Sequence, residues 1–422
     1  MIFYKNFFAL LFVLSFEMLF AQNETTIKTS IYGEVIDRPN SKNLLLVKAF
    51  DDARHDKIAT IPIIDGEFEY ILNSDEILAF ELIFEEEFYK GAMMPITFFS
   101  ENGTLKLKLN DSEKFLENKI EGGKLNHKLN HFNTTIKEEF YDKYKSIEEE
   151  YKDIPREQFF SEAYHEVITK LKNAKTQEEK VPVYKEMESL RKSGLDKSEL
   201  GKEKYAKDKI LFDAYLKDKY DYIINNLDEV SFHMVIEDLM GIKYNNVDEA
   251  LIRNAFKVLK EKFSNHSYTK LGVNLLHALK GLKPGGQYVN FTATDVNGNT
   301  FEFKSVLEKN KVVLLDLWAT WCGPCIAKTR LVKPIYEKYK NKGFTILGVA
   351  GEFKSLDRYH KFMKKEQWEW QQLIELDKQN GIWEKYNVMN GGGGMFLIAG
   401  SGEVLAVNPS AEEVDAILKK RL

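Results

Sequence analysis

Hydrophobic and polar positions alternate along the first quarter of the chain. From residue 26 to residue 110, short runs with a period of two residues are separated by turn residues, including Asp65-Gly66 and Asn102-Gly103. This alternation is typical of strands with one buried face, and both dipeptides favour tight hairpin turns. We therefore predict an antiparallel β-sandwich-like domain over residues 22–115, with about seven strands.

The hydrophobic period changes after Gly122-Gly123. Apolar residues then recur every three or four positions, in segments that extend to residue 279 (125–147, 160–171, 184–190, 210–224, 230–239 and 251–263). This spacing places the apolar side chains on one face of an α-helix, and many Lys and Glu residues fall on the other faces. The pattern predicts an α-helical region over residues 124–281.

A boundary follows at Lys283-Pro284-Gly285-Gly286. Proline lacks a backbone donor and glycine relaxes the dihedral limits, so this tetrapeptide is typical of a linker. Beyond it, strand patterns alternate with helical patterns, and the chain ends with a hairpin over 395–407 and a final helix. Such an order predicts a third domain over 286–422, built as a mixed α/β sheet with helices on both faces.

Composition and charge narrow the function. The chain has 422 residues, and about 150 residues per domain agrees with three units. Its 60 Lys and Arg are balanced by 65 Asp and Glu, so it lacks the positive field that nucleic-acid binding needs. With 44% hydrophobic residues, the chain can build folded cores. We expect a folded protein with no nucleic-acid partner.

The first 21 residues are typical of a secretory signal peptide. Lys5 precedes an apolar run from Phe7 to Phe16, and Ala21 precedes a polar segment. The alternative is a retained membrane anchor, but Glu17 interrupts the run, which is shorter than the ~20 apolar residues of a membrane span. We expect cleavage near Ala21, export to the periplasm or cell envelope, and no stable membrane span afterwards. No cysteine lies near this site to accept a lipid.

Cys322 and Cys325 are the only cysteines in the sequence. Exported proteins commonly use disulfides as structural staples, but a bond between these two residues closes too short a loop to stabilise so long a chain. A structural zinc site needs four ligands, and no second cysteine pair is present. The spacing therefore favours redox chemistry, with no metal and no cofactor.

The surroundings of the pair assign a role to each sulfur. The apolar run 312–319 is predicted to be a strand, and the cysteines follow where it gives way to a helix. There Cys322 meets unpaired backbone N–H groups and the positive end of the helix dipole, which favour a thiolate. Cys322 is the expected nucleophile, and Cys325, one turn later, is the expected resolving cysteine. Gly323 and Pro324 suit the first turn of a helix.

Asp316 lies in the middle of the apolar run. A carboxyl buried in such a strand has a raised pKa, and it could accept the proton of Cys325 through water. We predict this catalytic role for Asp316. The alternative is a structural residue that is hydrogen-bonded to the backbone.

The run LLDLWATWCGPC, with Trp318 and Trp321 beside the cysteines, resembles the active site of the TlpA/ResA-like branch of the thioredoxin superfamily. The resemblance implies a thioredoxin fold over 286–422 and a protein-disulfide oxidoreductase of the bacterial cell envelope. It further implies protein disulfide substrates, a DsbD-like membrane reductant as electron donor, and roles such as cytochrome c maturation. The Gly-Pro dipeptide is similar to that of reducing thioredoxins, near −270 mV, rather than of oxidants near about −120 mV, which favours reduction or shuffling of disulfides. The N-terminal domain resembles a small domain, without established activity, that precedes thioredoxin domains in many envelope proteins.

The sequence departs from this family at the loop that faces the cysteines. Where the family has a cis-proline, three residues before the Phe of the next strand, this chain has Gly393. A non-proline cis bond costs about 2.5–4 kcal/mol, so we expect a trans bond and a substrate-docking loop, made of Gly392, Gly393 and Gly394, with altered specificity. Lys328 and Arg330 stand where a carboxylate and a proline are common. They could lower the pKa of Cys322 or attract acidic partners, or they could be solvated surface.

Two other interpretations remain open at this stage. The first is an envelope binding or scaffold protein whose thioredoxin domain is catalytically weakened, and the second, a peroxide-reducing enzyme, fits the Trp-Cys-Gly-Pro-Cys run less well. Metal binding is not expected. We interpret His55, among Asp51, Asp52 and Asp56, as part of a solvated hairpin tip, and His127 and His131 as exposed polar residues.

Overall fold

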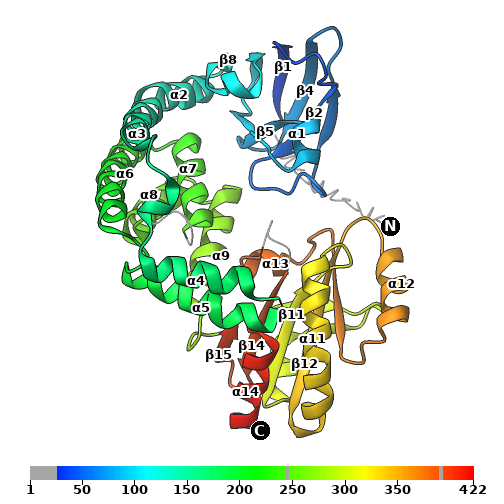
Figure 1. Cartoon of the computed structure of the whole chain (residues 1–422). Coiled ribbons are helices and arrows are strands. Elements are labelled where there is room, and N and C mark those ends of the chain that lie inside the picture. Colours follow the sequence, from blue (N-terminus) through cyan, green and yellow to red (C-terminus); the bar gives the residue numbers. More distant parts are fainter. Residues whose placement is uncertain (1–25, 176, 243–246, 389–392) are drawn as a thin grey trace, which may run out of the picture.

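The computed structural model describes residues 26–175, 177–242, 247–388 and 393–422 (Figure 1). The predicted signal peptide lies outside these residues. Figure 1 shows the helices as an arc between the N-terminal β domain and the C-terminal α/β domain. Within the described ranges, no helix combines the length and the apolar character needed to span a membrane.

The N-terminal domain contains two four-stranded sheets that share one hydrophobic core. The first sheet has the order β4 (Glu67–Ser74), β1 (Ile27–Val35), β7 (Gly103–Leu109) and β8 (Lys119–Glu121). The second has the order β3 (Ala59–Pro62), β2 (Asn43–Lys48), β5 (Ala79–Phe84) and β6 (Ile96–Phe99), with helix α1 (Glu85–Lys90) after β5. A 3-10 helix (Ser112–Glu117) connects β7 to β8.

Two details of this domain differ from the sequence prediction. Strand β1 pairs antiparallel with β4 but parallel with β7. All four strands of the second sheet lie in sequence between β1 and β7, so β1 and β7 are not joined as a hairpin. Hairpin signals specify only strands that are neighbours in sequence, and therefore they cannot reveal this pairing. Strand β8 pairs with β7, so the sheet extends to Glu121 rather than ending at residue 115.

The helical region packs directly on the β domain. Its elements are α2 (Lys124–Phe132), a π-helical turn (Asn133–Lys137), α3 (Glu138–Tyr151), a 3-10 turn (Arg156–Phe159), α4 (Glu162–Asn173), α5 (Gln177–Ser193), α6 (Glu199–Asn225), α7 (Glu229–Gly241), α8 (Glu249–Lys262) and α9 (Ser267–Gly281). Helix α7 is buried along most of its length, and Phe232 and Val235 belong to the same core as Leu82 and Leu105 of the sheets. The β domain and the helices therefore fold around one core.

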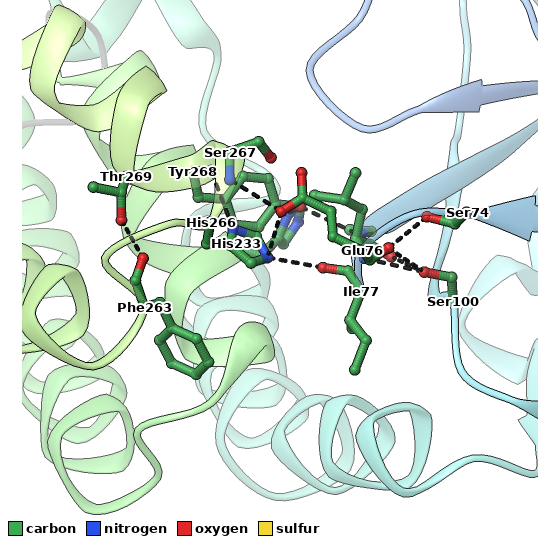
Figure 2. A network of polar contacts seen from close by, with 12 residues as sticks. Ser74, Glu76, Ile77, Ser100, His233, Phe263, His266, Ser267, Tyr268 and Thr269 are labelled. Carbon is green, nitrogen blue, oxygen red and sulfur yellow. Dashed lines mark hydrogen bonds and ion pairs between the residues drawn. The ribbon is translucent and has the colours of Figure 1, made fainter. Parts of the chain in front are cut away.

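Polar contacts fasten the two parts together at the start of α9 (Figure 2). The buried Tyr268 hydroxyl oxygen accepts a hydrogen bond from the Ala79 amide at 3.1 Å. His266 Nε2 lies 2.9 Å from the Ile77 carbonyl oxygen, and the Ser267 amide donates to the Glu76 carboxylate at 3.0 Å. Because these bonds cross between distant segments, they fix the β domain in one orientation on the helices.

The C-terminal domain has the α/β order that the sequence predicts. Its seven-stranded sheet runs β10 (Thr300–Glu302), β9 (Thr292–Thr294), β13 (Gln372–Leu376), β12 (Phe344–Glu352), β11 (Val312–Trp318), β14 (Gly394–Ala399) and β15 (Val404–Val407). Strands β11, β12 and β13 are parallel, and β14 pairs antiparallel with β11.

Helices cover both faces of this sheet. Helices α11 (Gly323–Tyr339), α12 (Asp357–Glu366) and α14 (Ala411–Arg421) pack on the face that carries Val312 and Leu314, whereas α10 (Phe303–Glu308) and α13 (Ile382–Lys385) pack on the face of Val313 and Leu315. The central strand β11 is buried at every position. Its carboxyl end leads into the cysteine pair.

Replacing Tyr268 by Phe tests the junction between the β domain and the helices. The ring stays, but the buried Ala79 amide loses its acceptor, so we expect the free energy of unfolding to fall by about 1–3 kcal/mol. The measurement is thermal or denaturant unfolding. The matched control is Tyr205→Phe at a half-exposed site, which should change stability little; equal effects of the two variants would contradict this role.

Candidate active site

The two cysteines lie at the N-terminal end of α11 and are joined as a disulfide. Cys322 is the N-cap residue, and its Sγ accepts a hydrogen bond from the Cys325 amide at 3.3 Å. Cys322 is 5% exposed and Cys325 is 8% exposed. An amide that points at Sγ, at the positive end of a helix, stabilises negative charge on that sulfur once the disulfide is reduced.

Asp316 lies on the same face of β11 as Leu314 and Trp318, directed toward α11. Its side chain is buried, and burial raises its pKa to about 7. The Thr329 hydroxyl lies 2.7 Å from Asp316 Oδ2 and 3.0 Å from the Cys325 carbonyl oxygen. Asp316 thus lies one side chain away from the backbone of Cys325.

The Thr329 hydroxyl couples the protonation of Asp316 to the first turn of α11. A hydroxyl has one proton to donate, so it serves both oxygens at once only if Asp316 is protonated and donates to Thr329 Oγ1. For an ionised Asp316 we expect the hydroxyl to donate mainly to the carboxylate, at the expense of its bond to the Cys325 carbonyl. Sequence reasoning missed Thr329, since a threonine in a helix carries no signal of its own.

The two tryptophans fix the strand and the turn around the cysteines. The buried Trp318 donates its Nε1–H to Gln372 Oε1 at 2.9 Å, and Trp321 donates its Nε1–H to the Gly351 carbonyl at 3.0 Å. The Glu352 carboxylate accepts bonds from the Thr320 amide at 2.7 Å and the Thr320 hydroxyl at 2.8 Å. Burial raises the pKa of Glu352. The polar partners from β12 and β13 were not predicted, because they are distant in sequence.

Gly393 lies directly against the disulfide. A Cβ atom at this position would lie 1.9 Å from the Leu317 carbonyl oxygen and 2.7 Å from Cys325 Sγ. Gly394 begins β14 and pairs with Leu317. The third residue of the predicted docking loop, Gly392, lies outside the described residues, and so does the peptide bond that joins it to Gly393. The close approach explains why a residue without a side chain stands at position 393.

The remaining predicted residues are placed as follows. Gly323 and Pro324 form the exposed first turn of α11, as expected. Arg330 forms an ion pair with Glu366 at 2.6 Å, which lowers the pKa of Glu366, and Lys328 is exposed. The guanidinium group of Arg330 is therefore engaged on the surface of α11 rather than at the sulfurs.

The three histidines that we interpreted as solvated surface residues differ in their surroundings. His127 and His131 are exposed. His55 does not form a solvated tip: its ring stacks on Phe353 with the ring centres 3.9 Å apart and also contacts Trp321. Among the described side chains, no cluster of three His, Cys, Asp or Glu residues could hold a metal ion.

Comparison with known proteins agrees with this geometry. Residues 284–407 match the AhpC/TSA family, and residues 29–129 match DUF4369, a domain of unknown function. Thiol-disulfide oxidoreductase ResA of Bacillus thuringiensis subsp. konkukian is 30% identical over 139 residues, which cover 77% of that protein and 32% of this chain. The chain belongs to this family of thiol-disulfide oxidoreductases. The thioredoxin-type domain and the β-rich N-terminal domain predicted from the sequence are confirmed.

Further relatives match the same thioredoxin domain. ResA of Bacillus subtilis is 30% identical over 123 residues, or 65% of that protein and 28% of this chain. A solved thioredoxin domain of a thiol-disulfide oxidoreductase from Bacteroides vulgatus is 25% identical, with a TM-score of 0.30, and covers 33% of this chain and 98% of its own. A thiol:disulfide interchange protein from Bacteroides sp. is 25% identical, with a TM-score of 0.29, over 32% of this chain and 88% of its own.

Replacing Asp316 by Asn should stabilise the oxidised thioredoxin domain in a pH-dependent way. The carboxyl has a pKa near 3.9 when unfolded and of about 7 when folded, so the folded state holds the extra proton between these values and loses stability as the pH rises through them. The variant lacks this loss. We expect a gain in unfolding free energy close to zero at pH 4 that rises to about 2–4 kcal/mol above pH 7. Parallel pH profiles for the two proteins in denaturant unfolding would contradict the prediction.

Replacing Gly393 by Ala should destabilise the active site. The new methyl group collides with the Leu317 carbonyl, and the backbone must move, so we expect a loss of about 1–3 kcal/mol in unfolding free energy and a slower reaction at the cysteines. Gly323→Ala is the matched control, because a Cβ there meets no atom within 4 Å. Equal stability of the two variants would show that position 393 has room for a side chain.

Proposed function

We propose that this protein is an exported thiol-disulfide oxidoreductase that reduces or shuffles protein disulfides. The observation that carries the proposal is the Cys322–Cys325 disulfide at the N-terminal end of α11, with the buried carboxyl of Asp316 behind it. The pair supplies two electrons, and the carboxyl supplies a proton acceptor whose pKa lies close to neutral pH. The Bacillus relatives named as thiol-disulfide oxidoreductases support the reaction class.

The reaction begins with the reduced pair. The Cys322 thiolate, stabilised by the Cys325 amide and the helix dipole, attacks one sulfur of the substrate disulfide. A mixed disulfide forms between Cys322 and that sulfur, and the substrate's other sulfur leaves as a thiolate, which takes up a proton from water. Because Cys322 is only 5% exposed, a substrate can react only if its disulfide reaches the N-terminal end of α11 closely.

The second step releases the product. Cys325 must lose its proton before it can attack Cys322 Sγ, and Asp316, when ionised, receives that proton through water. The new Cys322–Cys325 bond breaks the mixed disulfide, and the substrate's second sulfur leaves as a thiolate. Protonation of Asp316 restores both hydrogen bonds of Thr329, so the proton accepted in this step strengthens the hydrogen bonding around the first turn of α11.

The proposal also covers the direction of electron flow, the cellular location of the protein and the source of its electrons. The Gly323-Pro324 dipeptide favours a low potential, and hence reduction rather than oxidation of the substrate. The signal-peptide pattern of residues 1–21 supports export to the periplasm or envelope. A DsbD-like membrane reductant would then regenerate the dithiol, and cytochrome c maturation is one process that needs such reduction.

Substituting each cysteine in turn tests the proposed roles. Cys322→Ser should reduce the turnover of a protein disulfide to the uncatalysed rate, because the attacking sulfur is lost. Cys325→Ser should accumulate a mixed disulfide on Cys322, visible as a reducible adduct by mass spectrometry after expression with the export signal. Turnover by Cys322→Ser equal to that of the wild type would overturn the enzyme and leave a binding protein.

A further inference from the structure

A loop of the N-terminal domain covers the aromatic surface beside the nucleophile. The loop Asp51–Asp56 connects β2 to β3, on the side of the β domain that faces the thioredoxin domain (Figure 1). The His55 ring stacks on Phe353 with centres 3.9 Å apart and an angle of 5°, and it lies 4.8 Å from the Trp321 ring. Trp321 directly precedes Cys322 in the chain. A residue more than 260 positions away in sequence is thus in contact with the cysteine turn.

Two further contacts hold the loop in place. The Arg54 guanidinium lies over the Trp321 ring, 5.5 Å from its centre. Asp56 forms an ion pair with Lys378 of the thioredoxin domain at 2.5 Å. The stacked ring, the cation over an aromatic face and the ion pair act on three successive residues of one loop. Together they make a specific interface rather than a chance approach of two surfaces.

Hydrogen bonds within the loop define its turn. The Asp52 carboxylate accepts bonds from the Arg54 amide and the Arg54 Nε, both at 2.9 Å. The Asp52 carbonyl accepts from the amides of His55 at 2.9 Å and Asp56 at 2.8 Å. At its base, the Phe50 ring stacks on His233 of α7 at 4.7 Å. The loop is therefore held in place both by its own hydrogen bonds and by a contact with the helical region.

The surface under the loop is the kind that polypeptides bind. Trp321, Phe353 and Trp383 lie side by side, with ring centres 5.9 Å and 5.8 Å from Trp321, and they line a cavity of about 100 Å³ together with Asp51 and Asp52 of the loop. Clustered aromatic side chains next to a reactive group are favoured contact sites for a protein partner. With the loop in place, a folded substrate cannot lie on this surface.

We propose that the Asp51–Asp56 loop determines the specificity of the enzyme. By occupying the Trp321–Phe353 surface, the loop excludes bulky folded proteins on that side and admits small disulfides, or disulfides that project from their protein. Arg54 and His55 are the specificity-determining residues, and the N-terminal domain and the helices serve to place them. This inference rests on the proposed function, because it concerns access to Cys322.

The test compares two substrates. The double variant Arg54→Ala/His55→Ala and the wild type are assayed, with dithiothreitol as reductant, on oxidised insulin and on bis(2-hydroxyethyl) disulfide. Loss of the stacked ring and the cation should raise the ratio of kcat/KM for insulin to that for the small disulfide by about three- to tenfold. Lys57→Ala is the control: it removes an exposed cation of the same connection, for which the structure shows no contact with Trp321 or Phe353, and it should leave the ratio unchanged.

A charge exchange separates the interface from general damage to the loop. Lys378→Glu places a second negative charge beside Asp56, so it should also raise the ratio of kcat/KM for insulin to that for the small disulfide. The double exchange Asp56→Lys/Lys378→Glu restores opposite charges and should bring this ratio back toward the wild-type value. Thermal unfolding midpoints confirm that each variant is folded. If the double alanine variant keeps its turnover and its insulin-to-small-disulfide ratio of kcat/KM is unchanged or lower, the loop does not determine specificity. That result would leave the proposed function standing. No turnover of either disulfide by the wild type overturns the proposed function itself.

Discussion

The buried carboxyl of Asp316 meets no bulk water, and much of the active site follows from that constraint. Strand β11 is central in its sheet and covered on both faces, so the carboxyl is neutral at low pH and its pKa rises to about 7. Its carboxylate lies within hydrogen-bond distance of the Thr329 hydroxyl, which also reaches the Cys325 carbonyl. A group that changes charge near neutral pH is thereby tied to the helix turn that carries both sulfurs.

The parts of the chain outside the thioredoxin domain form a support for one loop. The β domain and helix α7 share a hydrophobic core, and the contacts of Tyr268, His266 and Ser267 fix their relative orientation. Burial lowers the pKa of His233 to about 4, so this histidine is neutral where Phe50 stacks on it. The same rigid unit carries the Asp51–Asp56 loop to Trp321. The helical arc in Figure 1 is thus the element that connects a domain of unknown function to the chemistry.

Local pattern was enough to predict much of the fold and the centre of the active site. The hydrophobic period located the three regions, and the Cys-Gly-Pro-Cys turn after an apolar strand located the sulfurs and Asp316, because strand, turn and helix are contiguous. Contacts between distant segments could not be predicted. The parallel pairing of β1 with β7, the carboxylate of Glu352 under Thr320 and the stacking of His55 on Phe353 all depend on how the chain returns on itself. His55 therefore looked like part of a solvated tip, although it lies against the active site.

The most direct test of this account is the midpoint potential of the Cys322–Cys325 couple. The folded protein is equilibrated with defined ratios of reduced to oxidised dithiothreitol, and the dithiol fraction is followed by thiol alkylation and mass spectrometry. If the protein reduces disulfides, the Cys322–Cys325 couple should show a two-electron transition at about −270 mV. A pair that is already fully reduced at every ratio, as a couple at about −120 mV would be, would contradict it, because the dithiol of such a couple is too weak a reductant for most protein disulfides.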